Sequence, residues 1–392
     1  MDWSVEMNKT ITIVILGAGY AGVAVAQKLA KLYKEKMDVE IVLIDQLEFH
    51  TMRTVLHELL VRKVQDDVAQ LALASIFEGT KVKFVQDKII SINQNSNKLI
   101  SENNVYSYDY LVVATGSQVE TFNTKGAKEF AHSIWTLEGI QVLRMHLENK
   151  LKEEEPIVVV GAGFTGIEIV GELASKYLDH KIMLINSSEE VLPTYPVNLR
   201  NKVTKRLSKI GVDLVSGVRV SEIQEDSVIL SDGRIIETST VIWSAGIRGA
   251  VILDQFDLEK NSRGQLVANK YLQSKDDEKI FLVGDVISYI GDDGKVVPQM
   301  VENAKASANL VVDNINRHKQ GQVLKGYKPS LHGSVVSIGN LYGVANLKFV
   351  GLPIRLTGLL AAFMKLAIHG TYYYSVMDAR KAWQYLKNKS SR

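Results

Sequence analysis

The sequence predicts an α/β protein made of two doubly wound parallel-sheet units and a separate C-terminal region. Two glycine-spaced turns carry this prediction, GAGYAG at residues 17–22 and GAGFTG at residues 161–166. Each turn follows a short β-branched run and precedes apolar residues at helical spacing, which is the order of a strand, turn, helix and strand unit. The length of 392 residues suits two or three domains rather than one core.

The expected elements follow the chain in a simple order. The first unit is predicted from a strand at 11–16, a helix at 23–33 and a strand at 39–44, and the second from a strand at 157–160, a helix at 167–177 and a strand at 182–185. Short strands at 82–85, 99–101 and 110–114 are typical of meander and return strands. A buried strand near Phe281 ends in Gly-Asp and precedes a helix at about 301–317, and an apolar helical pattern starts at Leu356.

The glycines have distinct tasks in a dinucleotide-binding turn. The first permits the tight bend, the second lets the backbone approach a pyrophosphate, and the third lets helix and strand pack closely, while the pyrophosphate sits on free N–H groups at the helix N-terminus. These tasks fall on Gly17, Gly19 and Gly22 in the first turn and on Gly161, Gly163 and Gly166 in the second. Two such turns in a complete βαβ context favour binding over packing, and they predict two Rossmann-like dinucleotide-binding domains.

The strand that follows each turn ends differently. Asp45 closes the first one, where a carboxylate receives the adenosine ribose hydroxyls. The second ends in Asn186, followed by Ser187 and Ser188, and the loop then supplies Glu189 and Glu190 but no lysine or arginine for a 2′-phosphate. An asparagine still hydrogen-bonds ribose hydroxyls. The pattern favours NADH over NADPH.

Composition excludes several classes of function. The net charge of +2 gives no general reason to expect a nucleic-acid partner. Cysteine is absent, which excludes disulfides, thiolate metal sites and a redox dithiol. The histidines, including His50, His57 and His369, form no metal-ligand pattern, so we expect them to be structural and expect no metal. The N-terminus does not resemble a signal peptide, and no apolar run is long enough for a spanning helix.

Three further stretches indicate a family. YDYLVVATGS at 108–117, VIWSAGI at 241–247 and KIFLVGDV at 279–286 resemble the crossing loops and the flavin motif of two-dinucleotide flavoprotein reductases. Without cysteine the chain does not fit the disulfide reductases, the thiol-based oxidases and peroxidases or the sulfide:quinone oxidoreductases. It resembles type II NADH:quinone oxidoreductase best, through GAGFTGIEIVGELA at 161–174 and SVVSIGNLYGVA at 334–345. The resemblance implies FAD, NADH, a menaquinone-like membrane quinone, a homodimer, and peripheral attachment to the cytoplasmic side of the cell membrane.

The resemblance also implies domain boundaries and site residues. We expect an FAD-binding domain at 1–118 and 271–325, an NADH-binding domain at 119–270 and a membrane-association region at 326–392. The predicted FAD residues are Gly17, Ala18, Gly19, Tyr20, Ala21, Gly22, Asp45, Gln46, Lys88 (through its backbone), Thr115, Gly116, Asp285, Glu302 and Lys365. The predicted NADH residues are Gly161, Gly163, Thr165, Gly166, Glu168, Asn186 and Gly246.

Glu172 is the predicted catalytic residue. It lies four residues after Glu168, so both carboxylates share a helix face, and their repulsion is expected to raise the pKa of one of them unless it contacts a ligand. The alternative is a solvated helix face. One segment departs from the family: VENAKA at 301–306 stands where AQxxxQ lines the quinone site, with Glu302 and Ala306 at the glutamine positions. A reductase with a non-quinone acceptor and a flavin- and nucleotide-binding sensor therefore stay open as alternatives.

The C-terminal region contains an apolar helical stripe. Its members are Leu356, Leu359, Leu360, Phe363, Met364, Ala367 and Ile368, and Arg355 and Lys365 lie off it. Tyr372, Tyr373 and Tyr374 follow, and then Ala382, Trp383, Tyr385 and Leu386 among Arg380, Lys381, Lys387, Lys389 and Arg392. Such a segment lies in a lipid headgroup layer or packs on the core or on a dimer partner. Because the resembled family has a lipid-dissolved substrate, we expect the membrane surface.

Overall fold

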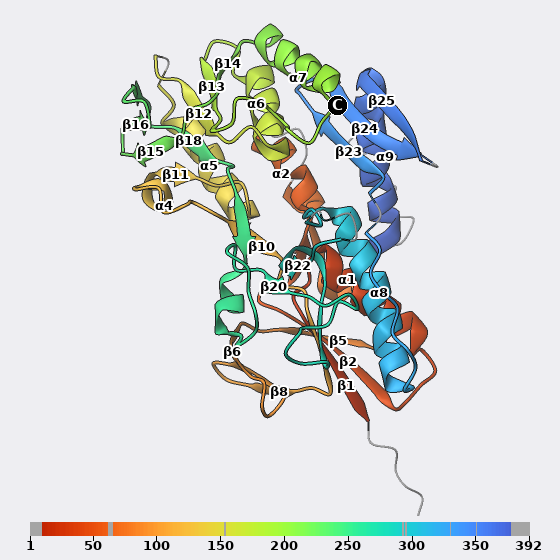
Figure 1. Ribbon diagram of the computed structural model, residues 1–392. Helices are drawn as coiled ribbons and strands as arrows, with labels where there is room; N and C mark the ends of the chain where they lie inside the picture. The colour runs from red at the N-terminus through yellow and green to blue at the C-terminus, as the bar shows by residue number, and fades with distance from the viewer. Residues whose placement is uncertain are drawn as a thin grey trace, which may run out of the picture. The chain divides into compact units, whose positions relative to one another are not determined.

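The computed structural model describes residues 10–61, 66–152, 154–291, 294, 296–329, 331–349 and 351–377, which form two compact units (Figure 1). Unit 1 draws on Met1–His50, Leu71–Gln118 and Ile247–Leu331. Unit 2 draws on Thr51–Gln70, Val119–Gly246 and His332–Arg392. Each unit is therefore assembled from segments that are far apart in the sequence.

Unit 1 is built on a five-stranded sheet with the order β21-β9-β1-β2-β5, in which every neighbouring pair is parallel. The central strand, β1 (Ile11–Leu16), is buried from Ile13 onward, as expected for a β-branched run covered on both faces. Helices α1 (Tyr20–Leu32) and α8 (Val301–Lys319) lie side by side and pack together (Figure 1). The first glycine turn follows the carboxyl end of β1, and the neighbouring strand β2 (Val39–Asp45) ends on the same side of the sheet.

The other elements of unit 1 are short. They are β3 (Phe49–Thr51), β4 (Gln70–Ala72), α3 (Leu73–Phe77), β5 (Val82–Gln86), β6 (Ile89–Asn93), β7 (Lys98–Ser101), β8 (Val105–Ser107), β9 (Tyr110–Val113), β10 (Ser117–Val119), β19 (Ile247–Gly249), η3 (Val251–Gln255), β20 (Leu266–Val267), β21 (Ile280–Leu282), η4 (Gly284–Val286) and β22 (Ile287–Ser288), where β3, β4 and β10 each extend across a unit boundary. Strands β6, β7 and β8 form an antiparallel meander. Of the short strands predicted at 82–85, 99–101 and 110–114, only the second lies in this meander, and the other two are β5 and β9 of the parallel sheet.

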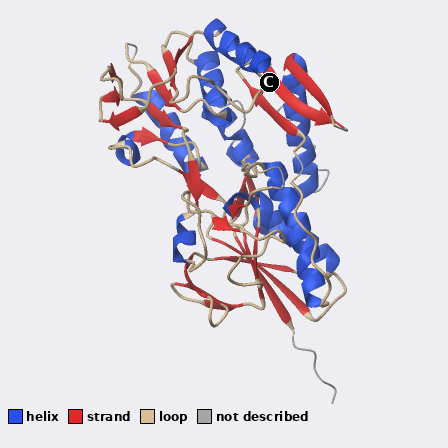
Figure 2. Cartoon of the chain, viewed as in Figure 1, coloured by secondary structure: helices blue, strands red, loops and turns tan. Residues whose placement is uncertain are grey.

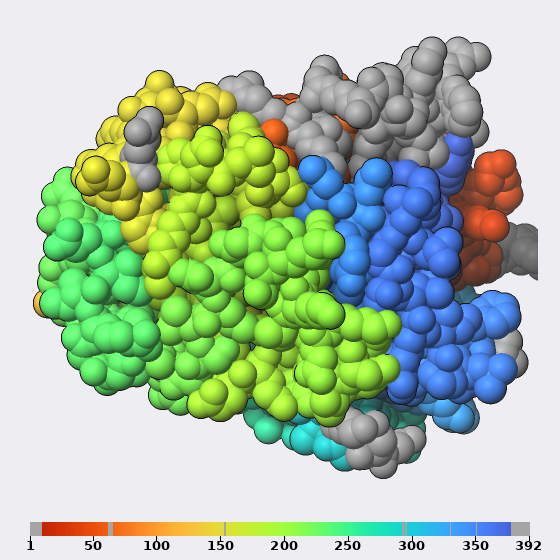
Figure 3. All heavy atoms as spheres, turned by 90° about the horizontal axis from the view of Figure 1, so that it is seen from above, coloured from red at the N-terminus to blue at the C-terminus, as the bar shows by residue number. Residues whose placement is uncertain are grey.

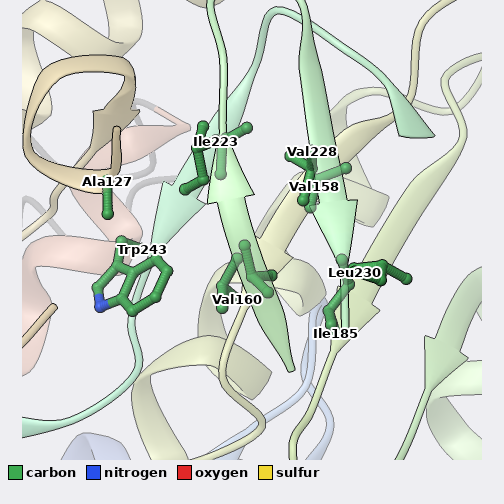
Figure 4. Close-up of a cluster of buried hydrophobic side chains, with 10 residues drawn as sticks. Ala127, Val158, Val160, Ile185, Ile223, Val228, Leu230 and Trp243 are labelled. Carbon is green, nitrogen blue, oxygen red and sulfur yellow. The ribbon is translucent and has the colours of Figure 1, made fainter. Parts of the chain in front are cut away.

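Unit 2 repeats the same plan. Its sheet has the order β11-β18-β12-β13-β14, again with parallel neighbours throughout. Strands β12 and β13, which flank the second glycine turn in sequence, therefore occupy the places that β1 and β2 have in unit 1. A meander, β15-β16-β17, packs one apolar face onto this sheet. Figure 4 shows the contact, with Ile223, Val228 and Leu230 of the meander facing Val158 and Trp243 of the sheet.

The elements of unit 2 up to residue 246 are short apart from three helices of 13 residues. They are η1 (Arg53–Val55), α2 (Leu56–Leu60), η2 (Asp66–Val68), α4 (Ala127–Phe130), β11 (Ala131–His132), α5 (Leu137–Asn149), β12 (Ile157–Val160), α6 (Phe164–Lys176), β13 (Ile182–Ile185), α7 (Val197–Lys209), β14 (Val212–Val215), β15 (Val220–Ile223), β16 (Ser227–Leu230), β17 (Ile235–Glu237) and β18 (Val241–Trp243). Helix α6 packs on α2 and on strands β12 and β13.

The C-terminal segment belongs to unit 2. Strands β23 (Gly333–Ser337), β24 (Gly343–Phe349) and β25 (Leu352–Gly358) form an antiparallel sheet, and helix α9 (Leu359–Val376) packs against all three (Figure 2). Strand β23 also contacts α6, and β24 contacts α7. In the space-filling view the blue C-terminal segment lies directly against the green segment that includes α7 (Figure 3).

Most predicted elements are present with shifted ends. The helices predicted at 23–33 and 167–177 begin earlier, at Tyr20 and Phe164, because the third glycine of each turn already lies in the first helical turn. The helix predicted from Leu356 begins at Leu359, because residues 352–358 pair with β24 as a strand. The N-terminal residues and the aromatic and basic positions from Arg380 to Arg392 lie outside the described residues.

Candidate functional sites

The first glycine turn has a geometry that only glycine permits at two of its three positions. Gly17 has φ +106°, and a Cβ there would lie 2.5 Å from the carbonyl oxygen of Ala114. A Cβ on Gly22 would lie 1.8 Å from the carbonyl oxygen of Gly17. Gly19, in contrast, caps α1 in extended conformation, and a Cβ there would have no atom within 4 Å. Open space therefore lies at the N-terminus of α1, where backbone N–H groups attract an anion.

The second turn reproduces this arrangement in unit 2. Gly161 has φ +104°, and a Cβ on Gly166 would lie 1.8 Å from the carbonyl oxygen of Gly161. Gly163 caps α6, and no atom lies within 4 Å of its added Cβ. The two turns are thus equivalent in backbone conformation, in packing and in the open space they leave. Both fit a pyrophosphate group.

The residues that end β2 and β13 also correspond to each other. The backbone N–H of Ala18 donates to Oδ2 of Asp45 at 2.6 Å, and that of Ala162 donates to Oδ1 of Asn186 at 3.3 Å. Asp45 also accepts from the N–H of Leu47 at 2.9 Å. Both side chains are therefore fixed beside the second residue of their turn, which is the position of the adenosine ribose in this class of fold.

Unit 1 brings the predicted crossing loop and the Gly-Asp motif together. The Ser117 hydroxyl donates to Oδ2 of Asp285 at 2.7 Å, and the side-chain amides of Gln265 and Gln299 donate to the Asp285 carbonyl at 3.0 and 3.1 Å. Thr115, beside Gly116 (φ +72°), buries a hydroxyl that has no hydrogen-bond partner among the described residues. An orphaned buried hydroxyl next to the glycine turn fits a bound polar group such as a dinucleotide.

The remaining predicted unit 1 residues have separate surroundings. Tyr20 begins α1 with its ring edge-on to His50, at 5.1 Å between centroids, and Ala21 is buried in the same turn. The carbonyl of Gln46 accepts from the Gln86 amide at 3.3 Å. Glu302 lies in the first turn of α8 and is half-buried.

Lys88 is placed by its neighbour Asp87. The Lys88 N–H donates to Oδ1 of Asp87 at 2.7 Å, which leaves its carbonyl as the backbone group to offer a ligand. Hydrogen bonds from Tyr106, Ser101 and Asn104 lower the pKa of Asp87 to about 2. Asp87 thus stays ionised at neutral pH and holds this loop in one conformation.

Unit 2 holds the predicted NADH residues and the predicted catalytic glutamate. Thr165 is exposed in the first turn of α6, and Gly246 (φ +72°) ends the crossing loop, with its carbonyl accepting from the N–H of Glu120 at 3.2 Å. Glu172 is buried on α6, with 1% of its surface exposed. A solvated helix face, the alternative for Glu172, is therefore wrong.

Glu168 and Lys365 form a largely buried ion pair, in which their side chains are 13% and 11% exposed. The Lys365 ammonium donates to Oε1 of Glu168 and to the Ser337 hydroxyl, both at 2.7 Å, and to Nε2 of His57 at 2.9 Å. Because Nε2 accepts, the ring proton is on Nδ1, which faces Oε2 of Glu168 at 3.5 Å. These four residues, called the buried cluster below, come from α6, α9, β23 and α2.

The buried cluster changes two expectations. Burial raises the pKa of Glu168 against the effect of Lys365, and nearby Glu58 raises it further, so burial rather than repulsion from Glu172 is the cause. All three donors of the Lys365 ammonium have partners within unit 2, so its contact with a flavin stays a prediction. Sequence reasoning missed His57 and Ser337 as partners, since no local spacing links four separate segments.

Two further features concern the part of the chain that the structure describes. Within it, no three histidine, aspartate or glutamate side chains are grouped so that they could hold a metal ion. None of its helices combines the length and the apolar character that crossing a bilayer requires.

Comparisons with known proteins agree with this geometry. Residues 11–308 match the family model of the pyridine nucleotide-disulphide oxidoreductases. A type II NADH:quinone oxidoreductase of Staphylococcus haemolyticus is 30% identical over 91% of this chain and 93% of its own length, and one of Haemophilus influenzae is 28% identical over 93% and 94%.

Solved structures agree on the fold. The structure of NDH2 from Plasmodium falciparum in complex with NADH has a TM-score of 0.84 at 16% identity and covers 97% of this chain and 98% of its own. A sulfide:quinone oxidoreductase from Aquifex aeolicus has a TM-score of 0.77 at 19% identity over 94% and 91%. The α/β fold with two dinucleotide-binding units is thereby confirmed. With its two equivalent turns and the relatives that match it almost end to end, the chain belongs to the type II NADH:quinone oxidoreductase family.

Proposed function

We propose that this protein oxidises NADH, passes the electrons through non-covalently bound FAD and reduces a membrane quinone without pumping protons. The observation that carries the proposal is the pair of equivalent glycine turns, one in each unit, in a chain of this family. When bound, FAD supplies the chemistry that accepts a hydride and passes on two electrons. The polypeptide supplies binding, orientation and charge.

Each turn is assigned to one nucleotide. The open space at Gly19 takes the FAD pyrophosphate, Asp45 takes its adenosine ribose, and Asp285 with Ser117 takes the ribityl chain. The open space at Gly163 takes the NADH pyrophosphate, and Asn186 takes its ribose. Fixing both nucleotides limits where the reacting rings lie, which is a proximity effect.

Steady-state kinetics test the proposal directly. The purified holoenzyme is expected to oxidise NADH rapidly with a menaquinone analogue and slowly without an added acceptor. Turnover that depends on a dye or a small protein rather than on quinone would favour a reductase with another acceptor, to which Glu302 in place of the family glutamine points. Flavin reduction by NADH without turnover would favour a sensor.

Glu172 is proposed to hold or relay a proton during acceptor reduction. Replacing Glu172 by glutamine keeps the shape of this buried side chain but removes its titration. We expect kcat with quinone to fall about a hundredfold, at the low end of general acid–base effects. Stopped-flow reduction of the flavin by NADH should change less than quinone-dependent reoxidation. Unaltered rates in both half-reactions would remove Glu172 from the site.

We propose peripheral attachment to the cytoplasmic side of the cell membrane, and the attachment itself is supported by an exposed face of α9. The predicted apolar stripe faces solvent in unit 2, with exposed fractions of 50% for Leu359, 66% for Leu360, 55% for Phe363 and 45% for Ile368. The opposite face, which includes Ala361, Lys365 and Tyr373, is buried. Because the acceptor is dissolved in lipid, we propose that this stripe binds the bilayer surface.

A vesicle assay tests this attachment. Replacing Leu360 and Phe363 together by asparagine should abolish flotation with vesicles of phosphatidylglycerol and phosphatidylethanolamine, because two exposed apolar anchors of about 2 kcal/mol each are lost. In a matched control variant, asparagine replaces Val142 and Met145 of α5, which are 46% and 56% exposed. This variant should float normally. Equal flotation of both variants would exclude the stripe as the anchor.

The homodimer remains a prediction, for which mass photometry is the measurement.

A further inference from the structure

The loop after β13 has the chemistry to select between NADH and NADPH, which differ only in a 2′-phosphate. Asn186 is fixed beside the second glycine turn through the Ala162 N–H. Its side-chain amide donates to the carbonyls of Ser188 at 2.7 Å and Glu190 at 3.1 Å. Both amide donors are therefore used within the loop, and the uncharged side chain cannot repel a phosphate. Selection between NADH and NADPH therefore has to come from a residue other than Asn186.

An ion pair borders the same position. The carboxylate of Glu190 contacts the guanidinium of Arg200, which lies in the first turns of α7 and ten residues further along the chain. The Arg200 side chain is 14% exposed, while that of Glu190 is 56% exposed. The guanidinium, which is a strong phosphate ligand, is thus enclosed, and its carboxylate partner faces outward.

The loop that carries Glu190 is joined to the pyrophosphate turn. The N–H of Leu192 donates to the carbonyl of Ala162 at 3.4 Å, and the Ser188 carbonyl accepts from the N–H of Gly217 at 3.2 Å. The loop therefore connects the glycine turn, the ribose position at Asn186 and the Glu190–Arg200 pair through hydrogen bonds. The loop from Asn186 to Glu190 contains no basic residue of its own, and Arg200 reaches it from helix α7.

We propose that the Glu190–Arg200 pair makes the protein selective for NADH: Glu190 repels the 2′-phosphate and holds Arg200 away from it. This inference rests on the proposed oxidation of NADH. Removing the Glu190 charge should do two things at once. It ends the repulsion, and it frees a guanidinium beside the ribose to bind phosphate. A charge about 6 Å from a phosphate dianion in water-like surroundings changes affinity about tenfold.

The test compares Glu190→Gln with Glu189→Gln in the holoenzyme. Glu189 lies in the same loop and carries the same charge, but its carboxylate lies next to Gly217, and a Cβ there would be 2.3 Å from its Oε1. We expect E190Q to raise the ratio of kcat/KM for NADPH to that for NADH at least about tenfold. E189Q should raise it clearly less, and E190Q/R200Q should keep the gain from the ended repulsion but lose the further gain that Arg200 supplies.

A binding measurement makes the test independent of turnover. Isothermal titration with 2′,5′-ADP and with 5′-AMP should show tighter binding of 2′,5′-ADP to E190Q than to the wild type, and little change for 5′-AMP. Equal gains in E189Q and E190Q, or a wild type that prefers NADPH, would overturn the inference while NADH oxidation stands. A wild type that neither binds nor oxidises NADH would overturn the proposed function as well.

Discussion

Replacing Gly163 by alanine is expected to lower kcat/KM for NADH by about a hundredfold while the protein keeps its FAD. Gly163 has φ −76°, so alanine fits the backbone, and its methyl group meets no protein atom within 4 Å. The methyl group instead occupies the open space at the N-terminus of α6, where the pyrophosphate must approach the backbone. The fold should therefore survive while NADH binding is lost.

Two companion variants separate binding from folding. Gly19→Ala makes the same change in unit 1, and it should give a folded protein that loses FAD and its yellow colour. Gly166→Ala places a methyl group 1.8 Å from the Gly161 carbonyl oxygen, so it should disrupt the turn itself and lower thermal stability. Binding is measured by NADH titration and flavin absorbance. A Gly163→Ala protein with near wild-type KM for NADH would contradict the assignment of this turn.

Replacing Lys365 by methionine is expected to destabilise the protein by about 3 kcal/mol, because it leaves a buried carboxylate without its cation. The ammonium contacts Glu168, Ser337 and His57 in a largely buried setting, and the carboxylate of Glu58 lies nearby. Methionine fills a similar volume, so the loss is mainly electrostatic. The measurement is denaturant unfolding followed by tryptophan fluorescence, since Trp135 and Trp243 both lie in unit 2.

A double variant and pH provide the controls. Adding Glu168→Gln to Lys365→Met should restore a large part of the stability, because no buried charge of this pair remains. The loss of stability caused by Lys365→Met should be smaller at pH 5 than at pH 8. Burial raises the pKa of Glu168 in the folded state, so the folded protein binds a proton there more readily than the unfolded chain does, and stability falls as pH rises. The exposed Lys209→Met should change stability by less than about 0.5 kcal/mol. Equal losses at positions 365 and 209 would refute the account.

Both βαβ units are predictable from the order of residues along the chain, because the signals involved are local. A strand of β-branched residues, a turn that needs glycine and an apolar helix are each specified within about thirty residues, so the positions of Gly17, Asp45, Gly161 and Asn186 follow from spacing alone. Both helices begin three residues earlier than predicted, since a glycine inside the first helical turn carries no apolar signal.

Contacts between groups that are distant in the chain depend on how its segments pack in three dimensions. His57, Glu168, Ser337 and Lys365 come from four elements, and Arg200 reaches Glu190 from the following helix. Periodicity identified the stripe of α9 but could not say which face is covered, because burial of one helix face depends on the strands it packs against. Pairing of charges is a long-range property, set by packing and desolvation rather than by the neighbouring letters of the sequence.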